Sequence, residues 1–210
     1  MLALLDFIDP KQLIERFGPI GLILIVFIES GLIPAPLPGD SLLFIAGFAA
    51  SAPEGGTLPH LNLGVLVVGA FVAAVLGGQI GYYIGARYGV RLFKPEAKLF
   101  KTKYADQASE FFAARGPRAI VIARFVPFVR TIVPILAGTG AMKARVFAIY
   151  NIVGALLWAV GVTLLGYFLG DTIGEDNIDK YLLPIVALIV VISLLPPLLE
   201  YRKHKRNKTA

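Results

Sequence analysis

Long apolar stretches separated by short polar ones run along the chain, and this pattern predicts an all-α integral membrane protein. Three stretches carry no charged residue and have the length of about 20 residues that a helix needs to cross a hydrocarbon core of about 30 Å. They cover residues 63–86, 146–170 and 181–199. Each is therefore expected to be one membrane-spanning helix.

Two further apolar stretches, 17–52 and 119–141, are interrupted by residues that break helices. The first holds Pro34, Pro36 and Pro38, followed by Gly39; the second holds Pro127, Pro134 and the run Ala137-Gly138-Thr139-Gly140. Proline interrupts helical hydrogen bonding and glycine permits tight turns. Each stretch is therefore expected to be a broken, re-entrant hairpin, whose irregular backbone must be buried in protein or line a cavity.

The composition supports this class and excludes others. Hydrophobic residues make up 57% of the 210 residues and charged residues 16%, against roughly 45–50% and about 25% in soluble domains. A soluble enzyme, a nucleic-acid-binding domain and a disordered chain are excluded. The chain has no cysteine and two histidines, one in a loop and one in the basic tail. We therefore expect no disulfide, no metal, no cofactor, no nucleic-acid partner and no enzymatic activity.

The distribution of charge predicts the topology. Segment 87–118 carries eight basic residues against three acidic ones, a net charge of +5, and the tail 200–210 is also basic. Segment 171–180 carries four acidic residues against one lysine. Because basic loops favour the cytoplasm, we expect a multi-pass membrane protein with a cytoplasmic C-terminus. Segment 87–118 is expected to be an amphipathic connector along the cytoplasmic surface.

Two parts of the chain share an ordered pattern. Pro36 and Ala46-Gly47 recur 91 residues later, and Gly69-Ala70 and Gly81-Tyr82-x-x-Gly85 recur 85 residues later. Because the charges orient 63–86 inward and 146–170 outward, repeat one (17–86) and repeat two (119–170) are predicted to have inverted topology within a single domain, 1–210. That architecture is typical of secondary transporters. Chance similarity between membrane helices is the alternative.

Four charged residues lie inside apolar stretches: Glu29 and Asp40 in the first hairpin, and Arg124 and Arg130 in the second. Such charges are costly in a bilayer and are paired, hydrated or functional. They either pin the two halves together as salt bridges or form a site. Arginine suits a phosphate because its planar fork binds two oxygens. The acids suit proton exchange, or hold the arginines when the site is empty.

These residues also carry a resemblance to a known family. The run from Glu29 through Pro34, Pro36 and Pro38 to Gly39-Asp40, and the run Arg124-Phe125-x-Pro127-x-x-Arg130-x-x-x-Pro134-x-x-Ala137-Gly138, resemble the two hairpins of the bacterial DedA family. The resemblance covers about residues 17–170. It implies that Arg124 and Arg130 bind phosphate and that Glu29 and Asp40 couple protons. Supporting positions under this resemblance are Pro36, Gly39, Pro127, Pro134, Gly138, Asn151 and Trp158.

The resemblance implies a flippase for a lipid phosphate, above all undecaprenyl (polyprenyl) phosphate, driven by the proton-motive force. A broad phospholipid scramblase without ion coupling, an intramembrane lipid-phosphate enzyme and a purely structural membrane protein are the alternatives. The expected partners are polyprenyl phosphate or phospholipid, protons and membrane lipid. The last helix, 181–199, lies outside the repeat and is open to serve as an anchor or as the face of a homo-oligomer.

Overall fold

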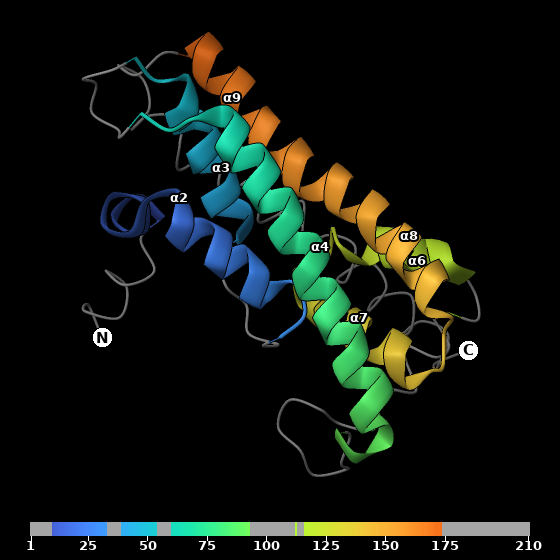
Figure 1. Ribbon diagram of the computed structural model, residues 1–210. Helices are drawn as coiled ribbons and strands as arrows, with labels where there is room; N and C mark the ends of the chain where they lie inside the picture. The colour runs from blue at the N-terminus through green and yellow to red at the C-terminus, as the bar shows by residue number, and fades with distance from the viewer. Residues whose placement is uncertain (1–9, 33–38, 54–59, 93–111, 113–115, 174–210) are drawn as a thin grey trace, which may run out of the picture.

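The computed structural model describes residues 10–32, 39–53, 60–92, 112 and 116–173, and within these ranges it is helical with no strand (Figure 1). The predicted all-α class is confirmed for this part of the chain. The predicted helix 181–199, the tail 200–210, most of the connector 87–118, and Pro36 lie outside the described residues.

Two long helices form the frame of the molecule. The first is α4 (Leu63–Tyr88); the second runs through α8 (Ala144–Ala155), η3 (Leu156–Val160) and α9 (Gly161–Ile173). Both are long and apolar enough to cross a membrane. They are antiparallel, since the Tyr82 ring stacks on Phe147 at 4.7 Å while Asn151 reaches back to Val75 (Figure 1). The predicted helices 63–86 and 146–170 are thus confirmed, each slightly longer than expected.

Local sequence accounts for the ends of α4. The Asn62 side chain accepts a hydrogen bond from the backbone N–H of Val65 at 3.0 Å, which caps the first turn. At the other end Gly89 has φ 48°, a conformation that glycine adopts without steric cost, and η1 (Gly89–Leu92) follows. Arg87 lies in the last turn, where a cation is favourable.

Four shorter helices pack around this frame. They are α2 (Pro10–Glu29), which is kinked at Gly18 before Pro19, α3 (Gly39–Ser51), α6 (Ala119–Ala123), which follows the short turn η2 (Gly116–Arg118), and α7 (Pro127–Thr139). The break between α6 and α7 falls where Pro127 predicted it. Pro127 is the first residue of α7, a position that needs no backbone N–H donor.

The helices α3 and α7, which follow the breaks, each lie against the long helix of the other predicted repeat. α3 packs along α9, and α7 packs along α4 (Figure 1). Glycines permit the approach: a Cβ on Gly47 would collide with the Thr163 carbonyl, and one on Gly138 with the Tyr82 carbonyl. Almost every residue of α3 is buried. Many large exposed side chains of α4 and of the α8–α9 helix, such as Val68, Ile152 and Phe168, are apolar and suit contact with lipid.

Candidate functional site

The four charged residues predicted to lie in the membrane flank the two breaks. Glu29 is the last residue of α2 and Asp40 the second residue of α3; Arg124 directly follows α6 and Arg130 is the fourth residue of α7. The acidic pair therefore brackets the first break and the basic pair the second. This placement brings side chains about 90 to 100 positions apart in sequence into contact at the centre of the helix bundle.

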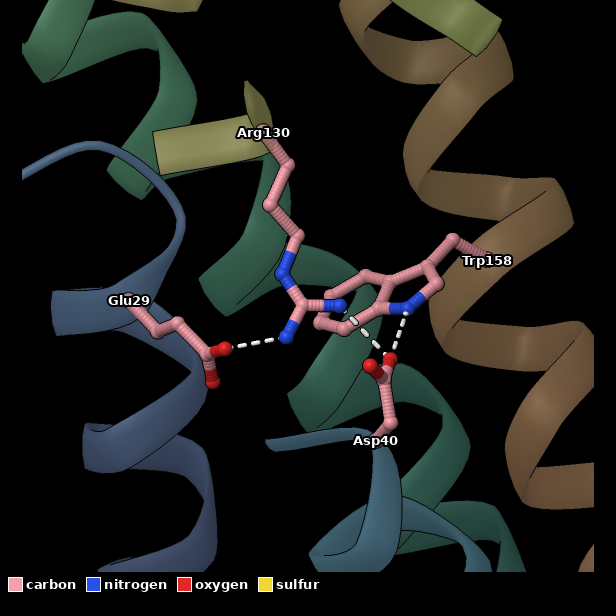
Figure 2. A network of polar contacts seen from close by, with 4 residues as sticks. All are labelled: Glu29, Asp40, Arg130 and Trp158. Carbon is pink, nitrogen blue, oxygen red and sulfur yellow. Dashed lines mark hydrogen bonds and ion pairs between the residues drawn. The ribbon is translucent and has the colours of Figure 1, made fainter. Parts of the chain in front are cut away.

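Arg130 binds both acids (Figure 2). Its Nη1 donates to Oδ1 of Asp40 at 2.6 Å, and its Nη2 donates to Oε1 of Glu29. Glu29 is 1% exposed and Arg130 4%, whereas the Asp40 side chain is 16% exposed. Because both carboxylates use one guanidinium, the cluster ties α2, α3 and α7 together.

Trp158 forms the far wall of this cluster (Figure 2). Its Nε1 donates to the same Oδ1 of Asp40 at 2.6 Å, and Cζ of Arg130 lies 4.5 Å from the ring centroid, within cation–π range. Trp158 sits in the middle of η3, a single turn of π-helix. Such turns are frequent at functional sites, and this one presents the indole to the cluster.

Arg124 has different partners. Its Nη2 donates to the carbonyl of Ala74 at 2.9 Å and to Oδ1 of Asn151 at 2.6 Å. Asn151 in turn donates from Nδ2 to the carbonyl of Val75 at 2.9 Å. Within the described ranges Arg124 forms no ion pair, so it is a buried cation held by neutral groups, with its Cζ 6.0 Å from the Trp158 ring.

Glycines leave room for these side chains. A Cβ on Gly39 would collide with the carboxylate of Glu29, and one on Gly154 would lie 2.8 Å from Cδ of Arg124. A Cβ on Gly78 would lie 3.1 Å from Nη2 of Arg124. The importance of Gly39 was predicted; Gly78 and Gly154 at this site were missed, although both belong to small-residue stretches of the long helices.

Several predicted supporting residues act on the backbone around the site. Pro134 lies inside α7 and supplies no N–H, so the carbonyl of Arg130 lacks its usual helical donor. Gly138 contacts α4 through backbone, as described above. The carbonyls of Ala74 and Val75 were not predicted, because a backbone acceptor leaves no signal in the residue type.

Some polar atoms of the cluster retain hydrogen-bonding capacity. Oε2 of Glu29, Oγ of Ser30 and Nε of Arg130 are buried without a hydrogen-bond partner. Buried polar groups of this kind are uncommon, and each calls for an explanation such as function. Within the described part of the chain, no group of three His, Cys, Asp or Glu side chains is placed to hold a metal ion. The contacts observed in the cluster are those of one guanidinium between two carboxylates.

Replacing Asn151 tests whether the amide clamp, the Asn151 side chain bonded to both Arg124 and the Val75 carbonyl, holds Arg124 in place. Asn151→Ala is expected to lower the free energy of unfolding by about 1.5–3 kcal/mol, because it removes a buried hydrogen bond to a charged group and leaves the Val75 carbonyl without its side-chain donor. Unfolding by SDS in mixed micelles measures the change. Asn151→Asp is the informative companion, since it places an anion beside Arg124; equal stability of all three proteins would contradict the clamp.

Comparison with known proteins identifies relatives of this chain. Residues 37–168 match the VTT domain. The chain is 43% identical over 188 residues to Protein DedA of Escherichia coli K12, covering 88% of this chain and 82% of that protein. It is 33% identical over 190 residues to Inner membrane protein YqjA of the same organism, covering 88% and 84%.

A third relative bears a different name. An Alkaline phosphatase-like protein of Lactococcus lactis is 30% identical over 202 residues, covering 92% of this chain and 91% of that protein. No solved structure matches the chain.

Proposed function

Because this chain belongs to the DedA family of VTT-domain membrane proteins, we propose that it carries a lipid phosphate across the bacterial plasma membrane. The proposed substrate is a polyprenyl phosphate, with undecaprenyl phosphate as the leading candidate. Only the head group passes through the protein, and the apolar tail stays in lipid. Relatives named as membrane and inner membrane proteins support the membrane location.

The observation that carries the proposal is the double ion pair of Arg130. Two carboxylate oxygens from different helices occupy the two ends of one guanidinium fork. A phosphate presents oxygens that the same fork binds in a bidentate manner. The two acids therefore occupy the donors of Arg130 that a phosphate would bind, so a phosphate must displace them. Arg124 supplies a second buried cation near the same indole ring.

Charge balance links phosphate binding to protons. Glu29 and Asp40 contribute −2 and Arg124 and Arg130 contribute +2, so the four residues sum to zero when ionised. Turning Arg130 towards a phosphate leaves buried carboxylate without its counterion, which is strongly unfavourable. Uptake of a proton by the acid removes that penalty. A proton gradient then drives the exchange in one direction.

The proposed transport cycle uses the two halves as an inverted repeat. The reciprocal packing of α3 on α9 and of α7 on α4 supports this, as does the use of matched glycines, Gly47 and Gly138, at the two contacts. In this proposal the hairpins enter the membrane from opposite sides, and the charges meet between them. The C-terminus is proposed to be cytoplasmic, from the basic tail.

Leaflet transfer of fluorescent polyprenyl phosphate in proteoliposomes tests this function. The parent is expected to transfer the lipid faster under a pH gradient, while Arg130→Ala and Glu29→Gln lose transfer. Arg87→Ala, an exposed position on α4, is the matched control for loss of an arginine. Transfer that ignores the gradient would favour a scramblase, and release of inorganic phosphate would favour an enzyme. No transfer by a folded parent would remove the proposed substrate.

A further inference from the structure

The two acids that bind Arg130 differ in what else they contact. Oδ1 of Asp40 accepts from both Nη1 of Arg130 and Nε1 of Trp158, each at 2.6 Å. Arg130 is the one side-chain donor to Glu29 within the described residues; the other neighbour is the backbone N–H of Gly39, and Oε2 has no hydrogen-bond partner. When Arg130 turns away, Asp40 keeps a side-chain donor and Glu29 keeps none.

The helix ends reinforce this difference. Asp40 lies in the first turn of α3, where the helix dipole and free backbone N–H groups favour a negative charge. Glu29 is the last residue of α2, where the dipole disfavours one. Asp40 is also partly exposed, whereas Glu29 is buried. The N-terminus of α3 serves both acids, since the Gly39 N–H donates to Glu29. The Trp158 donor and the partial exposure favour an ionised Asp40 alone.

We propose that Trp158 is a positioning residue that keeps Asp40 ionised and in place when Arg130 turns to a phosphate, so that Glu29 alone takes up the coupled proton. This inference rests on the proposed function and deepens it, because it separates the roles of two acids that the sequence presents as a pair. The Trp158 ring also lies against the guanidinium, so it guides Arg130 between its two partners.

The proton step involves one bond. A proton from solution forms an O–H bond on the Glu29 carboxylate as Arg130 leaves it, and the same bond breaks when the phosphate departs and the ion pair re-forms. The charged groups around Glu29 are Asp40 from α3 and Arg130 from α7. Arg124, which directly follows α6, lies near the Trp158 ring instead. The charged residue of α4 is Arg87, which is exposed, so α4 contributes no further proton acceptor.

Proton uptake on ligand binding measures this division of roles. Farnesyl phosphate, a short isoprenyl monophosphate, is titrated into the detergent-solubilised full chain in two buffers of different ionisation enthalpy at one pH. The difference in heat gives the number of protons taken up per ligand. The parent is expected to take up about one proton. The pH is set well above the second phosphate pKa of about 6, so the ligand is a dianion both free and bound and contributes no proton.

The variants separate the two acids. Glu29→Gln is expected to bind with nearly no proton uptake, whereas Asp40→Asn is expected to bind more weakly with uptake still about one. Trp158→Phe keeps an aromatic ring but loses the N–H donor, so Asp40 also takes up a proton and the number rises towards about two. Adding Asp40→Asn to Trp158→Phe is expected to restore the parent value.

The outcomes distinguish this inference from the function on which it rests. If a folded parent fails to bind farnesyl phosphate, the proposed function and this inference both fall. If the parent binds with proton uptake but Trp158→Phe takes up the parent number, the inference alone is overturned. It is equally overturned if Asp40→Asn loses the uptake and Glu29→Gln keeps it, a comparison that does not depend on the Trp158 variant folding.

Discussion

Arg130→Ala is expected to abolish transfer of polyprenyl phosphate and to lower the free energy of unfolding by about 3–5 kcal/mol, the cost of leaving one side of a buried ion pair without its partner. Here the cost falls on two acids, Glu29 and Asp40, which both bind the lost guanidinium. SDS unfolding in mixed micelles measures the stability, and leaflet transfer in proteoliposomes measures the activity. This is the largest single-residue effect that the structure predicts.

Two companion variants separate binding from folding. Arg130→Lys retains the charge but loses the planar fork that binds two oxygens through parallel hydrogen bonds; we expect it to fold and to fail in transfer. Arg130→Met combined with Glu29→Gln and Asp40→Asn removes all three charges together. It should regain most of the lost stability without regaining transfer. Normal transfer by Arg130→Lys would contradict bidentate binding of the phosphate by Arg130.

The second large effect is expected where the short helices meet the long ones. Adding a methyl group at Gly47 pushes against the Thr163 carbonyl of α9, and adding one at Gly138 brings it within 2.6 Å of the Ala86 nitrogen of α4. Overpacking of this kind costs about 1–3 kcal/mol per site. Because the two sites touch different helices, the double alanine variant is expected to lose about 2–6 kcal/mol in SDS unfolding.

Gly161 provides the matched control. It lies in the same continuous helix as Thr163, has helical dihedrals, and has nothing within 4 Å of an added Cβ. Gly161→Ala is therefore expected to raise the free energy of unfolding by about 0.5–1 kcal/mol, through helix propensity alone. A destabilised Gly161→Ala, or an undisturbed Gly47→Ala/Gly138→Ala double variant, would contradict the assignment of close backbone contacts.

Local signals in the sequence were enough to predict the frame. Uninterrupted apolar length marks the helices around 63–86 and 146–170, and Pro127 marks the start of α7. These features depend on the chain within a few residues, so the sequence carries them directly. The π-helical turn at Leu156–Val160 left no such signal, because nothing in its residues distinguishes it from ordinary helix.

The site itself was predicted as a set of residues but not as an arrangement. The sequence presents Arg124 and Arg130 as equivalent, and it presents the two acids as equivalent. Packing makes them different: Arg130 receives both acids, while Arg124 meets Asn151 and the carbonyl of Ala74. The partner of each arginine depends on how closely the helices approach one another at glycines. The spacing of residues along the chain does not reveal that interhelical distance.

The central claim is that Arg130 exchanges its two carboxylates for the phosphate of a lipid. Equilibrium binding of polyprenyl phosphate and of polyprenol, the same chain without phosphate, to the purified protein tests it most directly. The claim predicts saturable binding of the phosphate, little binding of the alcohol, and loss of that difference in Arg130→Lys. Equal binding of phosphate and alcohol by the parent, or an undiminished preference for phosphate in Arg130→Lys, would contradict it.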